Sequence, residues 1–143
     1  MLLQCPSGES KSTVLVVDDD DGVRNLIKQI LSKRALKVLT ASSGREALDL
    51  WSAHKDSISL VVTDLVVPGG LWGENLARII RLDNPDVRII YLSGHTKQTL
   101  DSATLQLDPK TNFLQKPFRH SELLELVGEI VRSSASPSHV TPY

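Results

Sequence analysis

Four consecutive aspartates, Asp18 to Asp21, follow directly on the apolar segment Val14–Val17. Two unit charges about 4 Å apart repel each other by roughly 4 kcal/mol at an effective dielectric constant of about 20. A strand that ends in several carboxylates therefore needs a positive charge nearby, and either a divalent metal ion or a lysine can supply it. The aspartate run is a candidate for metal binding.

Further apolar segments also end in groups that can do chemistry. Leu60–Thr63 is followed by Asp64, Ile89–Leu92 by Ser93, and Phe113–Gln115 by Lys116. In open sheets of parallel strands, ligands bind beyond the carboxyl ends of the strands, where strand order reverses. If these segments are strands of one sheet, their acids, hydroxyl and amine share one pocket with the aspartate run.

The hydrophobic pattern predicts strands that alternate with helices. The predicted strands are Thr13–Asp18, Leu36–Ala41, Ile58–Thr63, Val87–Leu92 and Asn112–Gln115. The predicted helices are Asp21–Lys33, a helix capped by Ser43 in a capping box with Glu46, Leu71–Leu82 with Leu76, Ile79 and Ile80 facing inward, Thr96–Leu105, and Ser121–Arg132. Such alternation predicts an α/β fold, a doubly wound, five-stranded parallel sheet with helices on both faces.

The chain has 143 residues, which suits one domain, and we expect it to span residues 13–132 between a flexible lead-in, 1–12, and a disordered tail, 133–143. The net charge of −1 gives no field of one sign that would favour nucleic acid or an anionic membrane surface. A single cysteine, Cys5, excludes an intramolecular disulfide. No apolar stretch approaches the roughly 20 residues that span a bilayer, so we expect a cytoplasmic location.

Each of these features also has an ordinary structural interpretation. Taken alone, the aspartate run is equally compatible with a solvated acidic loop, Asp64 with a helix cap, and Lys116 with a surface position. A calcium loop built around Gly22 would require a glutamate where Lys28 stands, which argues against that site. The occurrence of all these groups at successive strand ends favours the shared pocket.

Four segments of the sequence resemble the motifs of response-regulator receiver domains of two-component signalling. They are residues 14–24, 60–70, 92–96 and 113–118. The resemblance implies a flavodoxin-like (βα)5 fold with strand order 2-1-3-4-5. The Gly69-Gly70 pair and the Leu-Gln-Lys-Pro-Phe segment look most like receivers attached to hybrid histidine kinases.

The resemblance also implies a site. Asp64 would accept a phosphoryl group as an aspartyl phosphate. Asp19, Asp64 and the backbone carbonyl of Val66 would bind Mg²⁺, and Asp18 would act on the ion through water. Mg²⁺ prefers oxygen ligands and is usually held by one or two carboxylates together with waters, which suits this set.

Lys116 and Ser93 would contact phosphoryl oxygens, and Phe113 holds the position of the family's aromatic switch, which responds to movement of Ser93. Phe lacks the hydroxyl of the commoner Tyr, which favours an inward ring. Three further residues are expected beside the pocket: Asp20, His95 and Pro117, the last in a cis peptide bond with Lys116.

By resemblance, the phosphoryl donor is a histidine kinase or a histidine phosphotransfer domain carrying phosphohistidine, and the chain contacts no nucleic acid directly. The switching face would comprise 96–105, 112–115 and 121–132, through which a homodimer is conceivable. We expect no enzyme activity beyond self-phosphotransfer and slow self-dephosphorylation, because an apolar Val66 positions attacking water poorly. The alternative is a constitutive interaction module that phosphorylation does not regulate.

Overall fold

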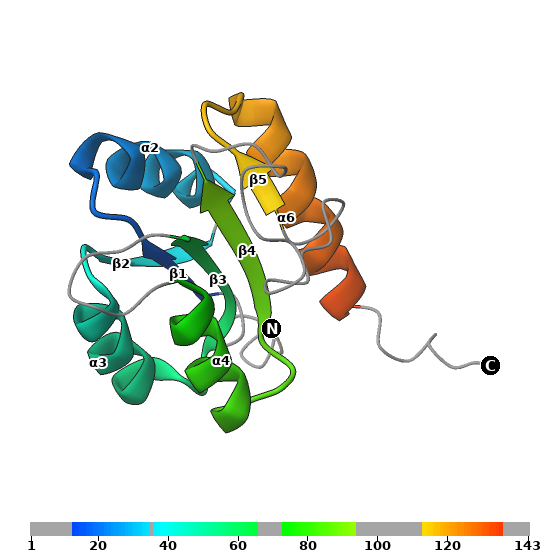
Figure 1. The fold of residues 1–143 in the computed structure, drawn as a ribbon. Coiled ribbons are helices and arrows are strands. Elements are labelled where there is room, and N and C mark those ends of the chain that lie inside the picture. Colours follow the sequence, from blue (N-terminus) through cyan, green and yellow to red (C-terminus); the bar gives the residue numbers. More distant parts are fainter. Residues whose placement is uncertain (1–12, 35, 66–72, 94–112, 136–143) are drawn as a thin grey trace.

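A computed structural model describes residues 13–34, 36–65, 73–93 and 113–135, which form one parallel sheet flanked by helices (Figure 1). Its strands are β1 (Thr13–Val17), β2 (Lys37–Ala41), β3 (Ile58–Asp64), β4 (Arg88–Ser93) and β5 (Phe113–Gln115). Its helices are α2 (Asp21–Ser32), α3 (Gly44–His54), α4 (Gly73–Asp83) and α6 (His120–Ala135). The strand order β2-β1-β3-β4-β5 confirms the predicted α/β class and topology.

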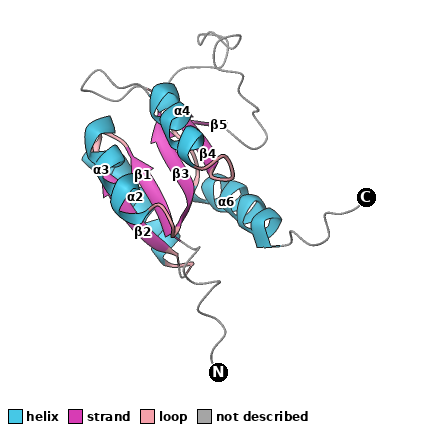
Figure 2. Ribbon diagram, turned by 90° about the horizontal axis from the view of Figure 1, so that it is seen from below, coloured by secondary structure: helices cyan, strands magenta, loops and turns pink. Residues whose placement is uncertain are grey.

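Two hydrophobic cores lie on opposite faces of the sheet because side chains alternate along each strand. In β1, Val14 and Val16 join the core under α2 and α6, whereas Leu15 and Val17 join the core under α3 and α4. Figure 1 shows these helix pairs on either side of the sheet, and Figure 2 shows the strands as a single layer. Because β1 is buried on both faces, its sequence is a continuous apolar run.

One predicted orientation and one predicted helix end differ clearly from the structure. Ile79 was expected to face inward, but its side chain is 41% exposed. The buried residues of α4 are Leu76, Ala77 and Ile80, so at about 100° per residue the apolar stripe is centred away from Ile79. Helix α6 runs to Ala135, past its predicted end at Arg132. The helix predicted for 96–105 lies outside the described residues.

Trp51 is a core residue, as expected, and it also has a polar role. Its side chain is 3% exposed, and the indole Nε1 donates a hydrogen bond to Asp83 Oδ2 over 2.8 Å. Lys55 Nζ lies 3.3 Å from the same oxygen. The indole hydrogen bond and then the Lys55 ammonium lower the pKa of Asp83, and the contacts fasten the end of α3 to the end of α4.

The predicted capping box at the start of α3 is present in modified form. Ser43 has an extended backbone, and its Oγ accepts a hydrogen bond from the amide of Glu46 over 3.2 Å. The Glu46 carboxylate reaches back to the amide of Ser42 over 2.8 Å instead of to that of Ser43. These bonds satisfy donors that a helix N-terminus otherwise leaves unpaired.

We therefore expect Ser43→Ala to lower the free energy of unfolding by about 1 kcal/mol, the usual cost of losing an N-cap side chain. Chemical denaturation followed by circular dichroism measures this. Ser52→Ala is the matched control, because Ser52 is an exposed position within α3 and alanine favours helix there. Equal stability of Ser43→Ala and the unmodified chain would show that the cap contributes nothing.

Candidate functional site: an acidic pocket closed by a lysine

The pocket begins where β1 ends. Asp18 is fully buried, its amide donates to Ala41 O of β2, and its Oδ1 accepts a hydrogen bond from the amide of Asp20 over 2.9 Å. The next residue, Asp19, is exposed. Register with β1 and β4 brings the end of β3, with Asp64, to the same edge of the sheet.

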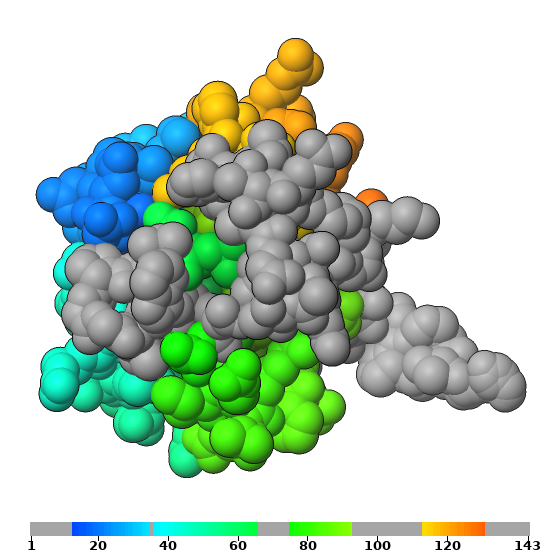
Figure 3. All heavy atoms as spheres, in the orientation of Figure 1, coloured from blue at the N-terminus to red at the C-terminus, as the bar shows by residue number. Residues whose placement is uncertain are grey.

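Lys116, just after β5, joins these acids. Its Nζ lies 2.8 Å from Asp18 Oδ2 and 3.1 Å from Asp64 Oδ2. The side chains of Lys116 and Asp64 are 20% and 13% exposed, so water screens these ion pairs less than it screens pairs at the surface. On the face of the molecule drawn in Figure 3, blue atoms of the part of the chain around α2 lie next to yellow atoms of the part around β5.

The charges of this pocket perturb one another. Burial raises the pKa of Asp18 above its ordinary value of 3.8, and the close contact with the positive charge of Lys116 opposes that shift. Desolvation alone would lower the pKa of Lys116, but its contacts with Asp18 and then Asp64 outweigh it, so that pKa is raised above 10.5. The lysine is therefore held as a cation, while the buried acid remains under-compensated.

Three carboxylates fit a divalent metal ion. Oxygen atoms of Asp18, Asp19 and Asp64 all lie within 4.8 Å of one another. Asp18 Oδ2 is buried and accepts no well-directed hydrogen bond within the described residues, although Lys116 forms an ion pair with it. A hard cation with oxygen ligands, such as Mg²⁺, suits this donor set, and its charge would relieve the repulsion between the carboxylates.

Asp20, predicted as a pocket neighbour, contacts the pocket through its amide and caps the following helix with its side chain. It is the N-cap of α2, and its Oδ1 accepts hydrogen bonds from the amides of Gly22 and Val23 over 2.8 and 3.2 Å. Its carboxylate is not one of the three that converge in the pocket. A capping carboxylate at a helix N-terminus also interacts favourably with the helix dipole.

Sequence patterns assign Arg24 no role, yet this residue contacts the acidic turn directly. Its Nη1 donates a hydrogen bond to the backbone oxygen of Asp18 over 2.7 Å, and its Nη2 forms an ion pair with Asp21. The Arg24 side chain is only 16% exposed. The available signal was its position one turn into the helix that follows the aspartates, with a side chain long enough to reach back.

The remaining predicted residues are placed only in part. Phe113 is buried in β5, in agreement with an inward ring, but its role as a switch stays a prediction. Ser93 ends β4 in register with Gln115 of β5, and its side chain is outside the described part of the structure. Pro117 follows Lys116 through the expected cis peptide bond. The predicted Val66 and His95 also lie outside the described residues.

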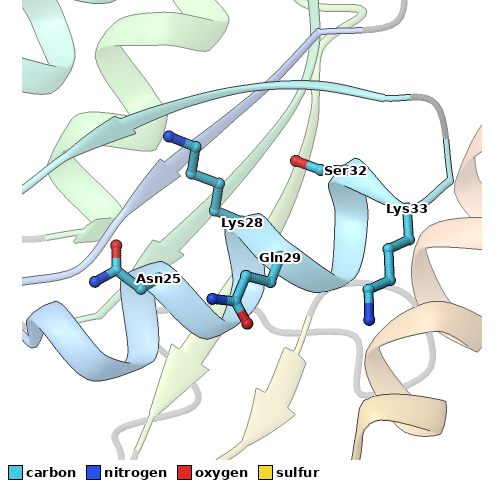
Figure 4. Close-up of a pocket in the computed structure, with 5 residues that line it drawn as sticks. All are labelled: Asn25, Lys28, Gln29, Ser32 and Lys33. Carbon is cyan, nitrogen blue, oxygen red and sulfur yellow. The ribbon is translucent and has the colours of Figure 1, made fainter.

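A separate polar pocket of about 520 Å³ runs along the exposed side of α2 (Figure 4). It is lined by Asn25, Lys28, Gln29, Ser32 and Lys33. It contains none of the acids that converge beyond the strands. The acids predicted to do chemistry lie elsewhere, at the edge of the sheet.

The fold and the acidic pocket define a class of α/β domain with a candidate cation site at the carboxyl ends of its strands, and comparison with known proteins identifies the family. Residues 14–128 match the family model of the response regulator receiver domain. The chain therefore belongs to the receiver domains of two-component response regulators. As a class, these domains are non-enzymatic switches that bind Mg²⁺ at an acidic pocket and interact with histidine kinases or phosphotransfer proteins.

Relatives of different architecture share this domain. The chain is 35% identical over 120 residues to the sensor kinase CckA of Brucella abortus, covering 84% of this chain and 12% of that protein. It is 32% identical to the CpxR homologue of Haemophilus influenzae, a transcriptional regulatory protein, covering 90% of this chain and 54% of that one. The chain thus spans only part of the length of either relative.

Solved structures agree with this family assignment. A response regulator receiver domain protein from Clostridium thermocellum superposes with a TM-score of 0.76 at 27% identity, covering 87% of this chain and 97% of that one. NtrX from Brucella abortus, solved with ADP, gives a TM-score of 0.77 at 28% identity, covering 90% of this chain and 29% of NtrX.

In the described residues, no helix is long and apolar enough to cross a membrane.

Replacing Lys116 with Met removes the counterion of a buried acid. Without metal, we expect the variant to have a lower melting temperature than the unmodified chain. Added Mg²⁺ should raise the melting temperature of the variant by more than that of the unmodified chain, because the ion replaces the lost positive charge. Thermal unfolding with EDTA and with Mg²⁺ measures both effects.

The decrease in the free energy of unfolding caused by Lys116→Met should stay below the roughly 2–5 kcal/mol of a core truncation such as Leu123→Ala. The reason is that Asp18 can take up a proton once the lysine is gone. Lys55→Met is the control, since Lys55 pairs only with the half-exposed Asp83. A loss as large as that of Leu123→Ala, with no additional recovery in Mg²⁺, would contradict the expectation.

Proposed function

We propose that this chain is a phosphoacceptor switch, in which Asp64 receives a phosphoryl group from phosphohistidine of a kinase or phosphotransfer domain. The observation that carries the proposal is the convergence of Asp18, Asp19, Asp64 and Lys116 at one edge of the sheet. A carboxylate attacks phosphorus only if the negative charge of the incoming phosphate is neutralised. The pocket contains the groups to do so.

In the proposed reaction, an oxygen of the Asp64 carboxylate attacks the phosphorus atom. The bond from phosphorus to the imidazole nitrogen breaks, a bond from phosphorus to the aspartate oxygen forms, and the imidazole leaves as the neutral base after taking a proton. Lys116, already 3.1 Å from Asp64, would hold a phosphoryl oxygen. When bound by Asp19, Asp64 and the Val66 carbonyl, Mg²⁺ would supply the remaining positive charge, with Asp18 acting through water.

The switching step would follow from these new contacts. Ser93, at the end of β4, would donate a hydrogen bond to a phosphoryl oxygen, and Phe113 would respond in the neighbouring strand. Such coupling shifts the population of two arrangements of the face that includes β5 and α6. A partner that prefers one arrangement then reads the phosphorylation state. The apolar Val66 would position an attacking water poorly, so we expect the phosphoryl group to be lost slowly.

We also propose that the parent protein is a hybrid histidine kinase. The Gly-Gly pair after the acceptor motif and the similarity to the receiver-containing kinase CckA support this, whereas other relatives are transcriptional regulators. The full-length gene decides the matter: an upstream kinase core supports the proposal, and a downstream DNA-binding domain contradicts it.

Incubation of the chain with acetyl phosphate and Mg²⁺ should add one phosphoryl group, measured by intact-mass spectrometry. Hydroxylamine should remove it, because it cleaves acyl phosphates, and EDTA should prevent its addition. Asp64→Ala should abolish the addition. Asp56→Ala is the control, because Asp56 is an exposed acid outside the pocket. Undiminished addition in Asp64→Ala would show that Asp64 is not the acceptor.

The alternative, a constitutive interaction module, draws on the burial of Phe113, since a ring that is always inward transmits no signal. Binding of a phosphotransfer domain to the chain, before and after treatment with acetyl phosphate, distinguishes the two. We expect phosphorylation to change the affinity at least several-fold. Equal affinities, with Asp64 shown to be phosphorylated, would favour the constitutive module.

A further inference from the structure

Arg24 binds the acidic turn through its backbone. The guanidinium donates to the carbonyl oxygen of Asp18 over 2.7 Å and pairs with the carboxylate of Asp21. Its side chain is 16% exposed, although it lies in the first turn of a helix beside four acids. A planar guanidinium can bind two acceptors at once in a fixed geometry, which a lysine cannot.

The two contacts fix the turn between β1 and α2 on both sides of Asp19. The carbonyl of Asp18 precedes Asp19, and Asp21 follows it after one residue. Other bonds complete the turn: Asp18 Oδ1 accepts from the amide of Asp20, and the amide of Arg24 donates to the backbone oxygen of Asp20. The direction of the exposed Asp19 carboxylate therefore depends on a loop that Arg24 holds.

We propose that Arg24 is a positioning residue of the metal site: it orients Asp19 toward Asp18 and Asp64 without touching the ion. This inference rests on the proposed function, since it assumes that the acids bind Mg²⁺. Residues that orient metal ligands typically contribute 10- to 100-fold to metal affinity. Arg24 has the geometry of such a residue, because it contacts the backbone of the loop that bears the ligands.

A charge effect and a positioning effect of Arg24 predict opposite changes in the affinity for Mg²⁺ when this residue is removed. Arg24 is a cation close to the acids, and a cation repels Mg²⁺. If Arg24 acted only through its charge, its removal would tighten metal binding. If it positions Asp19, its removal weakens metal binding in spite of the lost repulsion. A role in stability alone would lower the melting temperature and leave the affinity of the folded chain for Mg²⁺ unchanged.

Isothermal titration of the full chain with Mg²⁺ measures the affinity directly. We expect Arg24→Ala to weaken it about tenfold. Arg24→Lys keeps the charge but can make only part of the contacts, so it should fall between Arg24→Ala and the unmodified chain; it also serves as the test should Arg24→Ala fail to fold. Circular dichroism verifies that each variant is folded.

Lys28→Ala and Asp21→Ala are the controls. Lys28 is an exposed cation one turn further along α2, so Lys28→Ala removes the same charge without touching the turn and should leave the affinity equal or slightly higher. Asp21→Ala breaks one of the two Arg24 contacts and keeps the bond to the Asp18 carbonyl. It should therefore weaken Mg²⁺ binding less than Arg24→Ala does.

Phosphorylation by acetyl phosphate supplies the second readout. In Arg24→Ala, the Mg²⁺ concentration for half-maximal rate should rise, while the rate at saturating Mg²⁺ approaches that of the unmodified chain. Unchanged or tighter Mg²⁺ binding in Arg24→Ala and Arg24→Lys would overturn the proposal. Absence of Mg²⁺ binding in the unmodified chain would overturn the proposed function itself, which is a different and recognisable failure.

Discussion

The buried carboxylate of Asp18 is the constraint on which the pocket depends. An ionised acid with no exposure to water is stable only beside a compensating charge. That charge comes from Lys116, which follows the edge strand β5, whereas Asp18 follows the second strand of the sheet. Neighbouring strands lie about 4.8 Å apart, so the lysine must reach back across β4 and β3. One long side chain thus links the first strand of the chain to the last.

If Asp64 accepts a phosphoryl group as proposed, the same interaction prepares the site for phosphate. Three carboxylates lie close together and one lysine pairs with two of them, so the pocket keeps excess negative charge and favours a hard divalent cation. With such an ion in place, Lys116 is no longer needed by Asp18 to the same degree and can share its charge with an anion on Asp64. In the proposed function, folding and phosphotransfer therefore use the same ammonium group. Loss of Lys116 would then change both the stability and the chemistry of this chain.

Sequence was sufficient for the features that depend on local pattern and parallel topology. Apolar runs that end in acids located the strand ends, and parallel strands then required Asp18, Asp64 and Lys116 to meet. It was insufficient where the outcome depends on which way a single side chain turns. Ile79 lies outside the apolar stripe of α4, which is centred on Leu76, Ala77 and Ile80. The bond from Trp51 to Asp83 joins two helices whose relative position no local pattern specifies.

The aspartate run shows the same limit most clearly, and also how its repulsion is relieved. Within a tight turn, successive side chains point in different directions, so four identical residues meet four different environments. Asp18 pairs with Lys116, and Asp20 caps the N-terminus of α2, where the helix dipole is positive. Asp21 pairs with Arg24. Only Asp19 among the four is both exposed and directed at the other pocket acids, which leaves it for the cation. The run therefore combines two acids of the candidate metal site, Asp18 and Asp19, with residues that shape and hold the turn.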